Sequence, residues 1–366
     1  MTRESYRCWA EISRSALRHN AAFVRSRIRS AELLAVVKAN AYGHGMIGVA
    51  QVLANDAQLF GVANLEEAIA LRAVLPHPII ILGPSTPEER PAIAEGGFIT
   101  SVSTFEEAQE FDRSTNGSAI YINFVIDTGM GRMGTPEAKA QDVFRKILKL
   151  PNIKIHSISS HLPVSNEDAE YTREELKRFR ELVRQFRAEF PGEYKVHILP
   201  SSGVLMFNEP PFDIVRAGLM LYGISPVPDF DKPLRPALTW KTRIGLIREL
   251  PKGSSISYGR TFITPKTMRV ATLTAGYADG YPRHLSNREA AVLVHGQRSE
   301  LLGRVTMDLM MVDVTDVSGA MVGDEVVLLG QQDDAQITAM ELAERAETIT
   351  WEITTRIGSR VQRVYL

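Results

Sequence analysis

Residues 35–45 of the chain read AVVKANAYGHG, and this stretch carries both the first sign of the fold and the strongest sign of chemistry. Its apolar start is typical of a buried strand, and its Gly-rich end is typical of a turn. Similar apolar runs recur along the first two-thirds of the chain, with segments of helical periodicity between them. We therefore expect strands at residues 34–38, 59–63, 79–82, 99–102, 120–126, 153–160, 196–199 and 214–216.

This alternation predicts a fold of the α/β class. Eight strands with helices between them, in about 220 residues, are typical of a (β/α)8 TIM-like barrel. An open, doubly wound sheet is the alternative that the same alternation allows. We expect helices with Thr104 and Thr135 as N-cap residues, at residues 65–75, 105–112, 136–148 and 168–190.

The pattern changes at residues 229–236, which read DFDKPLRP and are typical of a linker. Beyond it, short β-prone runs alternate with turn residues, and one helix is expected near residues 337–345. The β-prone runs lie at residues 238–250, 255–258, 268–274, 290–295, 310–314 and 324–329. The sequence thus predicts a barrel domain over residues 1–233 and a mostly antiparallel β domain over residues 234–366.

The composition excludes several classes of protein. The 366 residues carry a formal net charge of −1, so there is no basic excess for nucleic acid. The single cysteine, Cys8, rules out an internal disulfide and a cysteine-based zinc cluster, and we expect no metal. We see no apolar signal-peptide core, and the apolar runs fall far short of the roughly 20 residues that span a bilayer. We expect a cytoplasmic enzyme without membrane or nucleic-acid partners.

Barrel enzymes carry their catalytic groups at the carboxyl ends of the strands. Two turns after the last predicted strands, Ser201-Ser202-Gly203 and Ala217-Gly218, offer backbone N–H groups and little bulk, which suits a phosphate. The strand ends also carry charged or titratable residues, namely Lys38, Arg132, His161 and Arg216.

Lys38 is the most informative of these residues. Its stem leaves an apolar strand, where desolvation lowers the pKa of an amine and favours a Schiff base with an aldehyde cofactor. The alternative is a lysine whose buried stem carries its ammonium to solvent. His161 could equally be a hydrogen-bonded core histidine, and Arg132 a surface residue of a Gly-rich loop.

The ordered motifs resemble the alanine racemase family, enzymes of fold type III that use pyridoxal 5′-phosphate (PLP). The matching stretches are AVVKANAYGHG, DTGMGRMG, the dipeptide HL at residues 161–162, VRAGLMLYG, SYGRTF, GYADGYPR, GRVTMD and RVQRVY. The resemblance covers nearly the whole chain. It implies an isomerase that interconverts L- and D-alanine and supplies D-alanine for peptidoglycan. It also implies a head-to-tail homodimer in which the β domain of each subunit completes the other's site.

The resemblance further implies a role for each matching residue. Lys38 would hold PLP and act as the base on the D face, and Tyr258 of the partner subunit as the base on the L face. Racemisation needs two such bases because a proton leaves one face of Cα and another arrives on the opposite face. Arg132 and Met307 would bind the substrate. The remaining cofactor-binding residues implied are Tyr42, His161, Ser201, Arg216, Gly218, Leu219 and Trp351.

Five positions depart from the usual pattern of the family. A lysine that often braces the arginine of DTGMGR is Val125 here, so Arg132 lacks that brace. A tyrosine near the phosphate and the substrate side chain is Trp351, whose indole differs in bulk and shape from a phenol. The other differences are Asn166 for an aspartate, Pro200 for an asparagine and Thr306 for a cysteine. They bear on the substrate, and a racemase for serine or another small amino acid is the alternative.

Two other functions match parts of this pattern. A PLP decarboxylase for basic amino acids would share the fold, but such chains are longer and carry a cysteine motif in the β domain, where this chain has Tyr258. A PLP-binding regulatory protein would be a barrel alone, without the stretches SYGRTF and GRVTMD. Racemisation assays across a panel of amino acids discriminate between these functions.

Overall fold

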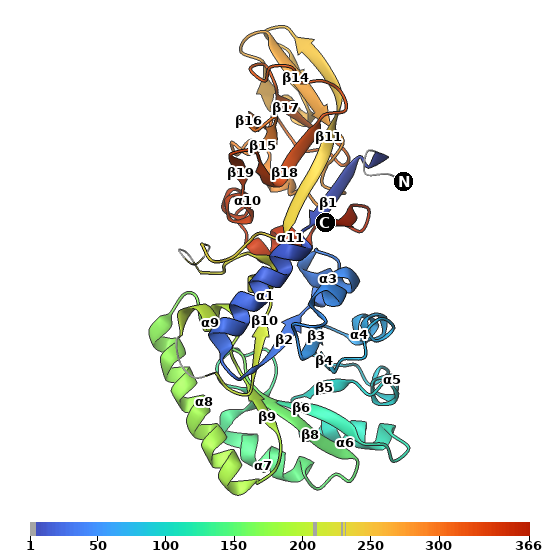
Figure 1. The fold of residues 1–366 in the computed structure, drawn as a ribbon, viewed down its shortest axis with the longest axis vertical. Coiled ribbons are helices and arrows are strands. Elements are labelled where there is room, and N and C mark those ends of the chain that lie inside the picture. Colours follow the sequence, from blue (N-terminus) through green and yellow to red (C-terminus); the bar gives the residue numbers. More distant parts are fainter. Residues whose placement is uncertain (1–4, 208–210, 228–229, 231) are drawn as a thin grey trace. The chain divides into compact units, whose positions relative to one another are not determined.

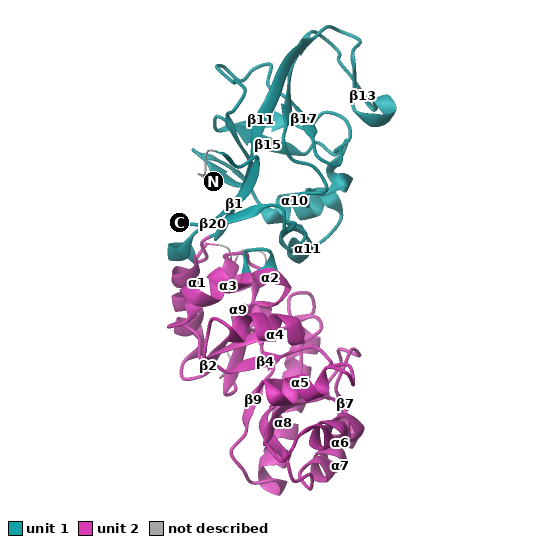
Figure 2. Cartoon of the chain, turned by 90° about the vertical axis from the view of Figure 1, so that its right-hand side faces the viewer, with its two compact units in different colours: residues 1–16, 42–45, 236–366 teal, residues 17–41, 46–235 magenta. Residues whose placement is uncertain are grey.

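The computed structural model describes residues 5–207, 211–227, 230 and 232–366. Contacts divide the chain into two compact units, coloured separately in Figure 2. The barrel unit comprises Leu17–Ala41 and Met46–Arg235, and the β-rich unit comprises Tyr42–Gly45, Pro236–Leu366 and the N-terminal residues up to Ala16. The linker predicted at residues 229–236 includes 229 and 231, which lie outside the described residues.

The barrel unit contains eight parallel strands in one nearly closed sheet (Figure 1). They run in the order β10-β2-β3-β4-β5-β6-β8-β9, and the two ends approach where the amide of Arg216 donates to the carbonyl of Leu199 at 3.1 Å. The predicted (β/α)8 barrel is confirmed, and the open sheet is wrong. The strands are β2 (Glu32–Val36), β3 (Leu59–Val62), β4 (Ile79–Ile81), β5 (Ile99–Val102), β6 (Ile120–Asp127), β8 (Ile153–Ser159), β9 (Lys195–His197) and β10 (Ile214–Ala217), with the short β7 (Thr135–Pro136) beside β6.

Helices lie between the barrel strands because their apolar faces pack on the sheet. In the longest helix, α8, the fully buried Phe179 and Phe186 recur at helical spacing, and burying such a side chain stabilises a fold by about 1.5–3 kcal/mol. Thr104 caps α6 in a capping box, as predicted, whereas Thr135 lies in β7 and caps no helix, so that prediction is wrong. The helices are α1 (Arg14–Ile28), α2 (Lys38–Tyr42), α3 (Met46–Leu53), α4 (Leu65–Arg72), α5 (Arg90–Glu95), α6 (Phe105–Ser114), α7 (Glu137–Ile147), α8 (Ala169–Glu189), α9 (Ser201–Met206) and the 3-10 helix η2 (Leu219–Tyr222).

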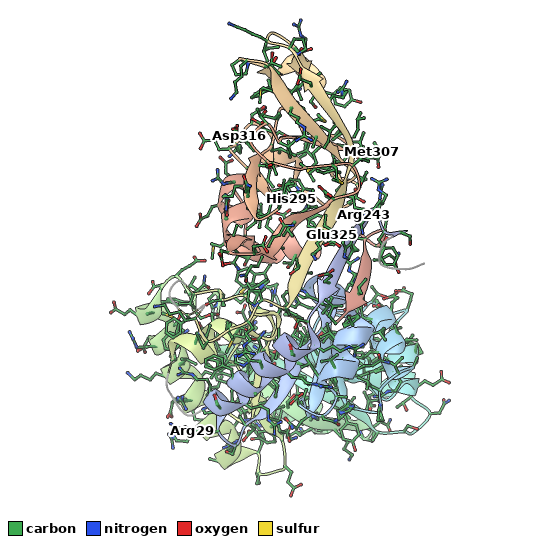
Figure 3. All side chains as sticks on the ribbon, turned by 45° about the horizontal axis from the view of Figure 1, so that its top comes forward. Arg29, Arg243, His295, Met307, Asp316 and Glu325 are labelled. Carbon is green, nitrogen blue, oxygen red and sulfur yellow. The ribbon has the colours of Figure 1, made fainter. Side chains whose placement is uncertain are left out.

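The β-rich unit is built on a sheet with the order β16-β15-β18-β11-β1-β20, and β14 joins β11 to β17. The N-terminal β1 pairs antiparallel with β11 and parallel with β20, so both chain ends belong to this sheet. Arg243 and Glu325, labelled in Figure 3, are register partners on β11 and β18. The strands are β1 (Cys8–Ile12), β11 (Leu238–Leu250), β12 (Ser255–Ile256), β13 (Phe262–Ile263), β14 (Met268–Leu273), β15 (Ala291–Val294), β16 (Gln297–Glu300), β17 (Met310–Asp313), β18 (Glu325–Gln332), β19 (Ala335–Ile337) and β20 (Gln362–Tyr365).

A mostly β second domain is thus confirmed. The helical segments of this unit are short, namely η3 (Tyr258–Arg260), η4 (Arg283–Leu285), α10 (Ala339–Ala346) and α11 (Thr350–Thr355). Its core contains the fully buried rings of Trp9, Trp240 and Tyr281, the last two with ring centroids 5.9 Å apart. Trp9 comes from β1, which explains why the N-terminal strand belongs to this unit.

Candidate active site

Lys38 follows β2, at the carboxyl end of the barrel strand where a catalytic group is expected. The residue is only partly exposed, and desolvation lowers the pKa of its amine below the usual lysine value. The cations Arg132 and Arg216 lower that pKa further, while the carboxylate of Glu67 opposes them. Lys38, Arg132 and Arg216 therefore influence one another electrostatically at this end of the barrel, and the two arginines favour anionic ligands.

The backbone after Lys38 forms a left-handed turn. Ala39, Asn40, Ala41 and Tyr42 all have φ between 51° and 53°, and each L-residue in this region costs roughly 1–2 kcal/mol. Such a run persists only where surrounding bonds hold it. The amide of Ala41 donates to the carbonyl of Val37 at 2.8 Å, and the amide of Ala39 donates to Oε1 of Glu67 at 2.7 Å.

Glu67 is a site residue that sequence reasoning missed. It lies in the first turn of α4, and its other carboxylate oxygen accepts from the amide of Ala63 at 2.8 Å, so it ties the turn to the end of β3. Asn64 caps the same helix turn by accepting from the Glu67 amide at 3.1 Å. An asparagine three residues before a glutamate is the pattern that could have drawn attention to this position.

Arg216, on β10, is buried at the centre of a hydrogen-bond network. Its Nη2 donates to the carbonyls of Ser160 and Ile198 and lies 3.1 Å from Nδ1 of His161, and its Nη1 lies 2.6 Å from Nδ1 of His197. Within the described residues Nε makes no hydrogen bond, so its N–H can donate to a ligand. Burial lowers the pKa of Arg216 to about 10, which leaves the guanidinium charged at neutral pH.

The two histidines beside Arg216 are held neutral. A guanidinium only donates, so Nδ1 of both His161 and His197 must accept, and the proton of each ring sits on Nε2. Desolvation and then the charge of Arg216 lower the pKa of His161 to about 3 and that of His197 well below its usual value. His161 is therefore a neutral ring beside a fixed cation.

A buried polar chain runs across the barrel interior from His197. Nε2 of His197 lies 3.3 Å from the hydroxyl of Ser157, which donates to Oδ1 of Asn123 at 2.9 Å. The amide nitrogen of Asn123 donates to the hydroxyl of Ser101 at 3.1 Å. The sequence analysis missed these residues because each is a single polar residue in an otherwise apolar strand. Only the assembled barrel brings them next to one another.

The two predicted phosphate-binding turns meet. The hydroxyl of Ser201, at the start of α9, accepts from the amide of Gly218 at 2.9 Å and from that of Met220 at 3.4 Å. The adjacent Ser202 lies 2.6 Å from the hydroxyl of Ser165. Small residues and backbone N–H groups from the ends of β9 and β10 are thus gathered at one place, together with Leu219 at the start of η2.

Arg132 stands in a loop that is shaped by Asp127 at the end of β6. The Asp127 carboxylate accepts from the amides of Gly129 and Gly131, at 3.0 and 3.1 Å, which folds the loop back on itself. Arg132 is exposed, and in the described part of the chain no carboxylate pairs with its guanidinium. Val125, the position at which we expected a brace for Arg132 to be missing, is buried on the same strand as Asp127.

The remaining predicted site residues belong to the β-rich unit. Tyr258 is 72% exposed and Met307, labelled in Figure 3, is 54% exposed, so both side chains are available to another molecule. Trp351 lies in α11, and Tyr42 is buried, with a pKa that burial raises to about 12. The structure therefore groups one set of predicted residues in the barrel unit and a second set in the β-rich unit.

Tyr258 is presented by a strained turn. Ser257 has φ 63° and ψ −178°, a region that is essentially restricted to glycine. Its hydroxyl donates to the carbonyl of Arg304 at 2.6 Å, which connects the stretches SYGRTF and GRVTMD. A Cβ on Gly259 would lie 2.9 Å from Nη1 of Arg304, so the turn also packs closely on that side chain.

Across the described ranges, no cluster of three or more His, Cys, Asp or Glu side chains could hold a metal ion. The same ranges contain no helix with the length and apolarity that a membrane crossing requires.

The chain belongs to the alanine racemase family. Its residues 12–226 match the family's "Alanine racemase, N-terminal domain" and residues 237–365 match "Alanine racemase, C-terminal domain". An alanine racemase of Methylacidiphilum infernorum is 40% identical, over 100% of this chain and 96% of that protein. Both the fold and the full length of the chain therefore place it among these isomerases.

Solved structures agree with this assignment. The alanine racemase of Streptomyces lavendulae is 35% identical and superposes with a TM-score of 0.92, over 98% of this chain and 97% of that one. The alanine racemase of Bartonella henselae, solved with covalently bound pyridoxal phosphate, is 28% identical with a TM-score of 0.89, over 99% of this chain and 100% of that one.

Proposed function

We propose that the protein is a PLP-dependent racemase that interconverts L- and D-alanine by a two-base mechanism. The observation that carries this proposal is Lys38, a desolvated amine with a lowered pKa at a barrel strand end, beside Arg132 and Arg216. A neutral amine is the form that attacks an aldehyde, and the desolvation that lowers the pKa of Lys38 favours that form. Membership of the alanine racemase family, with a relative that holds PLP covalently, supports the same function.

The residues of the barrel unit fit the parts of PLP. Lys38 would hold the aldehyde carbon, and the free Nε of Arg216 would donate to the ring nitrogen. Ser201 and the backbone of Gly218 and Leu219 would bind the phosphate. The other proposed cofactor contacts are His161 of the barrel unit and Tyr42 and Trp351 of the β-rich unit.

When bound, PLP draws electrons from Cα of the substrate. A carboxylate beside the ring nitrogen would accept a hydrogen bond from its protonated form and so make the ring more electron-withdrawing. Arg216 can only donate, so the ring beside it would be less electron-withdrawing. His161, beside Arg216, is neutral and would not protonate the cofactor ring either. We infer that this arrangement favours simple proton exchange at Cα over side reactions.

Two residues would move protons on opposite faces of the substrate. Lys38 would take or give the proton on the D face, and the partner's Tyr258 would do so on the L face. Arg132 would orient the substrate carboxylate, with the backbone of the partner's Met307 beside it. This division requires a homodimer, and the exposure of Tyr258 is consistent with a residue that serves another chain.

Peptide mapping tests the cofactor assignment. The protein reconstituted with PLP is reduced with borohydride and digested, and the adduct is expected on Lys38. The Lys38→Ala protein, treated identically, is the control and should carry no adduct. An adduct on another lysine, or none in the wild-type protein, would overturn the proposal.

A second experiment tests the substrate. Racemisation is measured for alanine, serine and other small amino acids, and alanine is expected to give the highest kcat/KM. A preference for serine would favour the alternative that Trp351 and Asn166 suggest. We propose that the reaction takes place in the cytoplasm and supplies D-alanine for peptidoglycan, so expression should relieve the D-alanine requirement of a bacterial auxotroph.

A further inference from the structure

The carboxyl end of the left-handed turn is held by the last strand of the chain. The stretch RVQRVY, at residues 360–365, contains β20 and has no role in the chemistry proposed above. Within the β-rich unit, Nε of Arg363 donates to the carbonyl of Gly43 at 2.9 Å. The hydroxyl of Tyr365 lies 2.9 Å from the carbonyl oxygen of His44 and 2.7 Å from that of Gly45. Two side chains thus contact three successive carbonyls, and the single O–H of Tyr365 is shared between those of His44 and Gly45.

Arg363 is itself anchored by backbone groups. Its Nη1 donates to the carbonyls of Gly358 and Val361, and its Nη2 donates to that of Ile357, each at 2.6 Å. A guanidinium presents a planar fork of donors, so contacts on one side restrict the direction of the N–H on the other. The bond from Arg363 to Gly43 therefore has a defined geometry.

The two glycines of the GHG stretch permit this approach. A Cβ on Gly43 would lie 2.0 Å from the carbonyl oxygen of Thr354, and one on Gly45 would lie 2.5 Å from the hydroxyl of Tyr365. Both glycines also have left-handed φ values, 86° and 93°. The sequence YGHG is thus adapted to lie directly against the C-terminal segment.

The other end of the turn is held by the barrel unit. Glu67 binds the amide of Ala39, and Oδ1 of Asn40 accepts from the amide of Met46 at 2.9 Å. Four consecutive left-handed residues do not hold their conformation alone, because the left-handed region is unfavourable for L-residues. A strained segment of this kind needs an anchor on each side.

We propose that Arg363 and Tyr365 form a carbonyl clamp that positions the turn bearing Lys38, and with it the amine that meets the cofactor. This proposal rests on the function proposed for Lys38. Arg363 and Tyr365 are positioning residues, because they act through the backbone of Gly43–Gly45 and touch no reacting atom.

Hydrogen exchange in the apoprotein tests the clamp. Tyr365→Phe removes one hydroxyl and keeps the ring, and Gln362→Ala changes an exposed residue of the same strand as a matched control. Amides of residues 39–46 should exchange about tenfold faster in Tyr365→Phe, the scale of one lost buried hydrogen bond. Those of β6 should be unchanged, and the control variant should resemble the wild type. Unchanged exchange at residues 39–46, or equal acceleration everywhere, would overturn the clamp.

A second measurement connects the clamp to Lys38. PLP is added to each apoprotein, and the rate of adduct formation at Lys38 is followed by borohydride trapping at several pH values. Tyr365→Phe should lower the rate of adduct formation and alter the pH dependence of that rate, and Gln362→Ala should do neither. Identical rates and pH dependence in Tyr365→Phe and wild type would contradict the positioning role.

Two further arms complete the design. If Tyr365→Phe does not fold, Arg363→Lys serves instead, since it keeps the charge but loses the fork of donors, and the same exchange and trapping results apply. If the wild-type protein forms no adduct at Lys38, the proposed function fails. The exchange result then still decides whether the clamp holds residues 39–46, so the two failures are distinguishable.

Discussion

Nη1 of Arg216 lies 2.6 Å from Nδ1 of His197, deep in the barrel interior. This contact sets the direction of every hydrogen bond beyond it, because the guanidinium can only donate and the imidazole must accept. The proton of His197 is then on Nε2, facing Ser157, and the chain continues through Asn123 to Ser101.

Replacing His197 by Leu should destabilise the protein. The substitution leaves an N–H of the buried Arg216 without its acceptor, and a hydrogen bond to a charged group contributes about 1.5–3 kcal/mol. Denaturant unfolding of the apoprotein measures the change in the free energy of unfolding. Ser101→Ala, at the far end of the same series of hydrogen bonds, is the control and should lose about 1 kcal/mol. Equal losses in the two variants would show that the contact with Arg216 has no special weight.

The neutral His161 predicts a pH dependence of stability. Its pKa is about 3 in the folded protein and 6.5 in the unfolded chain, so the unfolded state binds more protons between these values. Stability should therefore fall as the pH decreases through this window. In His161→Gln the side chain can still accept from Arg216. The decrease in the free energy of unfolding between pH 7 and pH 5 should be smaller in this variant by about 2 kcal/mol. An unchanged drop would mean that His161 is protonated in the folded protein.

The strained Ser257 predicts different outcomes for two substitutions. Ser257→Gly loses the bond to the Arg304 carbonyl but removes the strain, whereas Ser257→Ala loses the bond and keeps the strain. The alanine variant should be less stable than the glycine variant by about 1–3 kcal/mol. Thermal unfolding of the two apoproteins gives the comparison, and equal melting temperatures would argue against strain at this position.

The shared site of the proposed dimer can be tested by subunit mixing. Lys38→Ala and Tyr258→Phe should each be inactive alone. A hybrid dimer would contain one site with both bases, so mixing the two proteins under conditions of subunit exchange should restore part of the activity. Each variant mixed with itself is the control. Demonstrated exchange without recovered activity would contradict a site built from two chains.

The two-base assignment predicts an asymmetry between enantiomers. Tyr258→Ala should still exchange the α-hydrogen of D-alanine with deuterated solvent, because that step needs only Lys38. Exchange from L-alanine should fall by at least about 10²-fold, the lower scale for losing a positioned general base. Racemisation should fall in both directions. Equal loss of exchange from both enantiomers would instead favour a single base that samples both faces.

Local patterns predicted much of this architecture. The apolar runs and the periodic segments between them gave the strands and helices of the barrel, because each strand is buried on both faces and each helix on one. Strand ends then identified Lys38, Arg132, His161 and Arg216, since parallel strands bring their carboxyl ends to one face. Thr104 was predictable as an N-cap because capping is a contact within one helical turn.

The sequence by itself therefore determined the elements, the class of fold and the residue types at the barrel end. Only the tertiary structure decided which distant residues meet. Glu67 accepts from the amide of Ala39, and His197 contacts Arg216. Tyr365 donates to the carbonyl of Gly45, although most of the chain separates the two residues in sequence. The physical reason is that these are hydrogen bonds between groups far apart in sequence, whose directions depend on how the sheets close. Periodicity and spacing record the neighbours along one element, whereas a left-handed turn or a buried guanidinium is stable only in the context that the whole fold supplies.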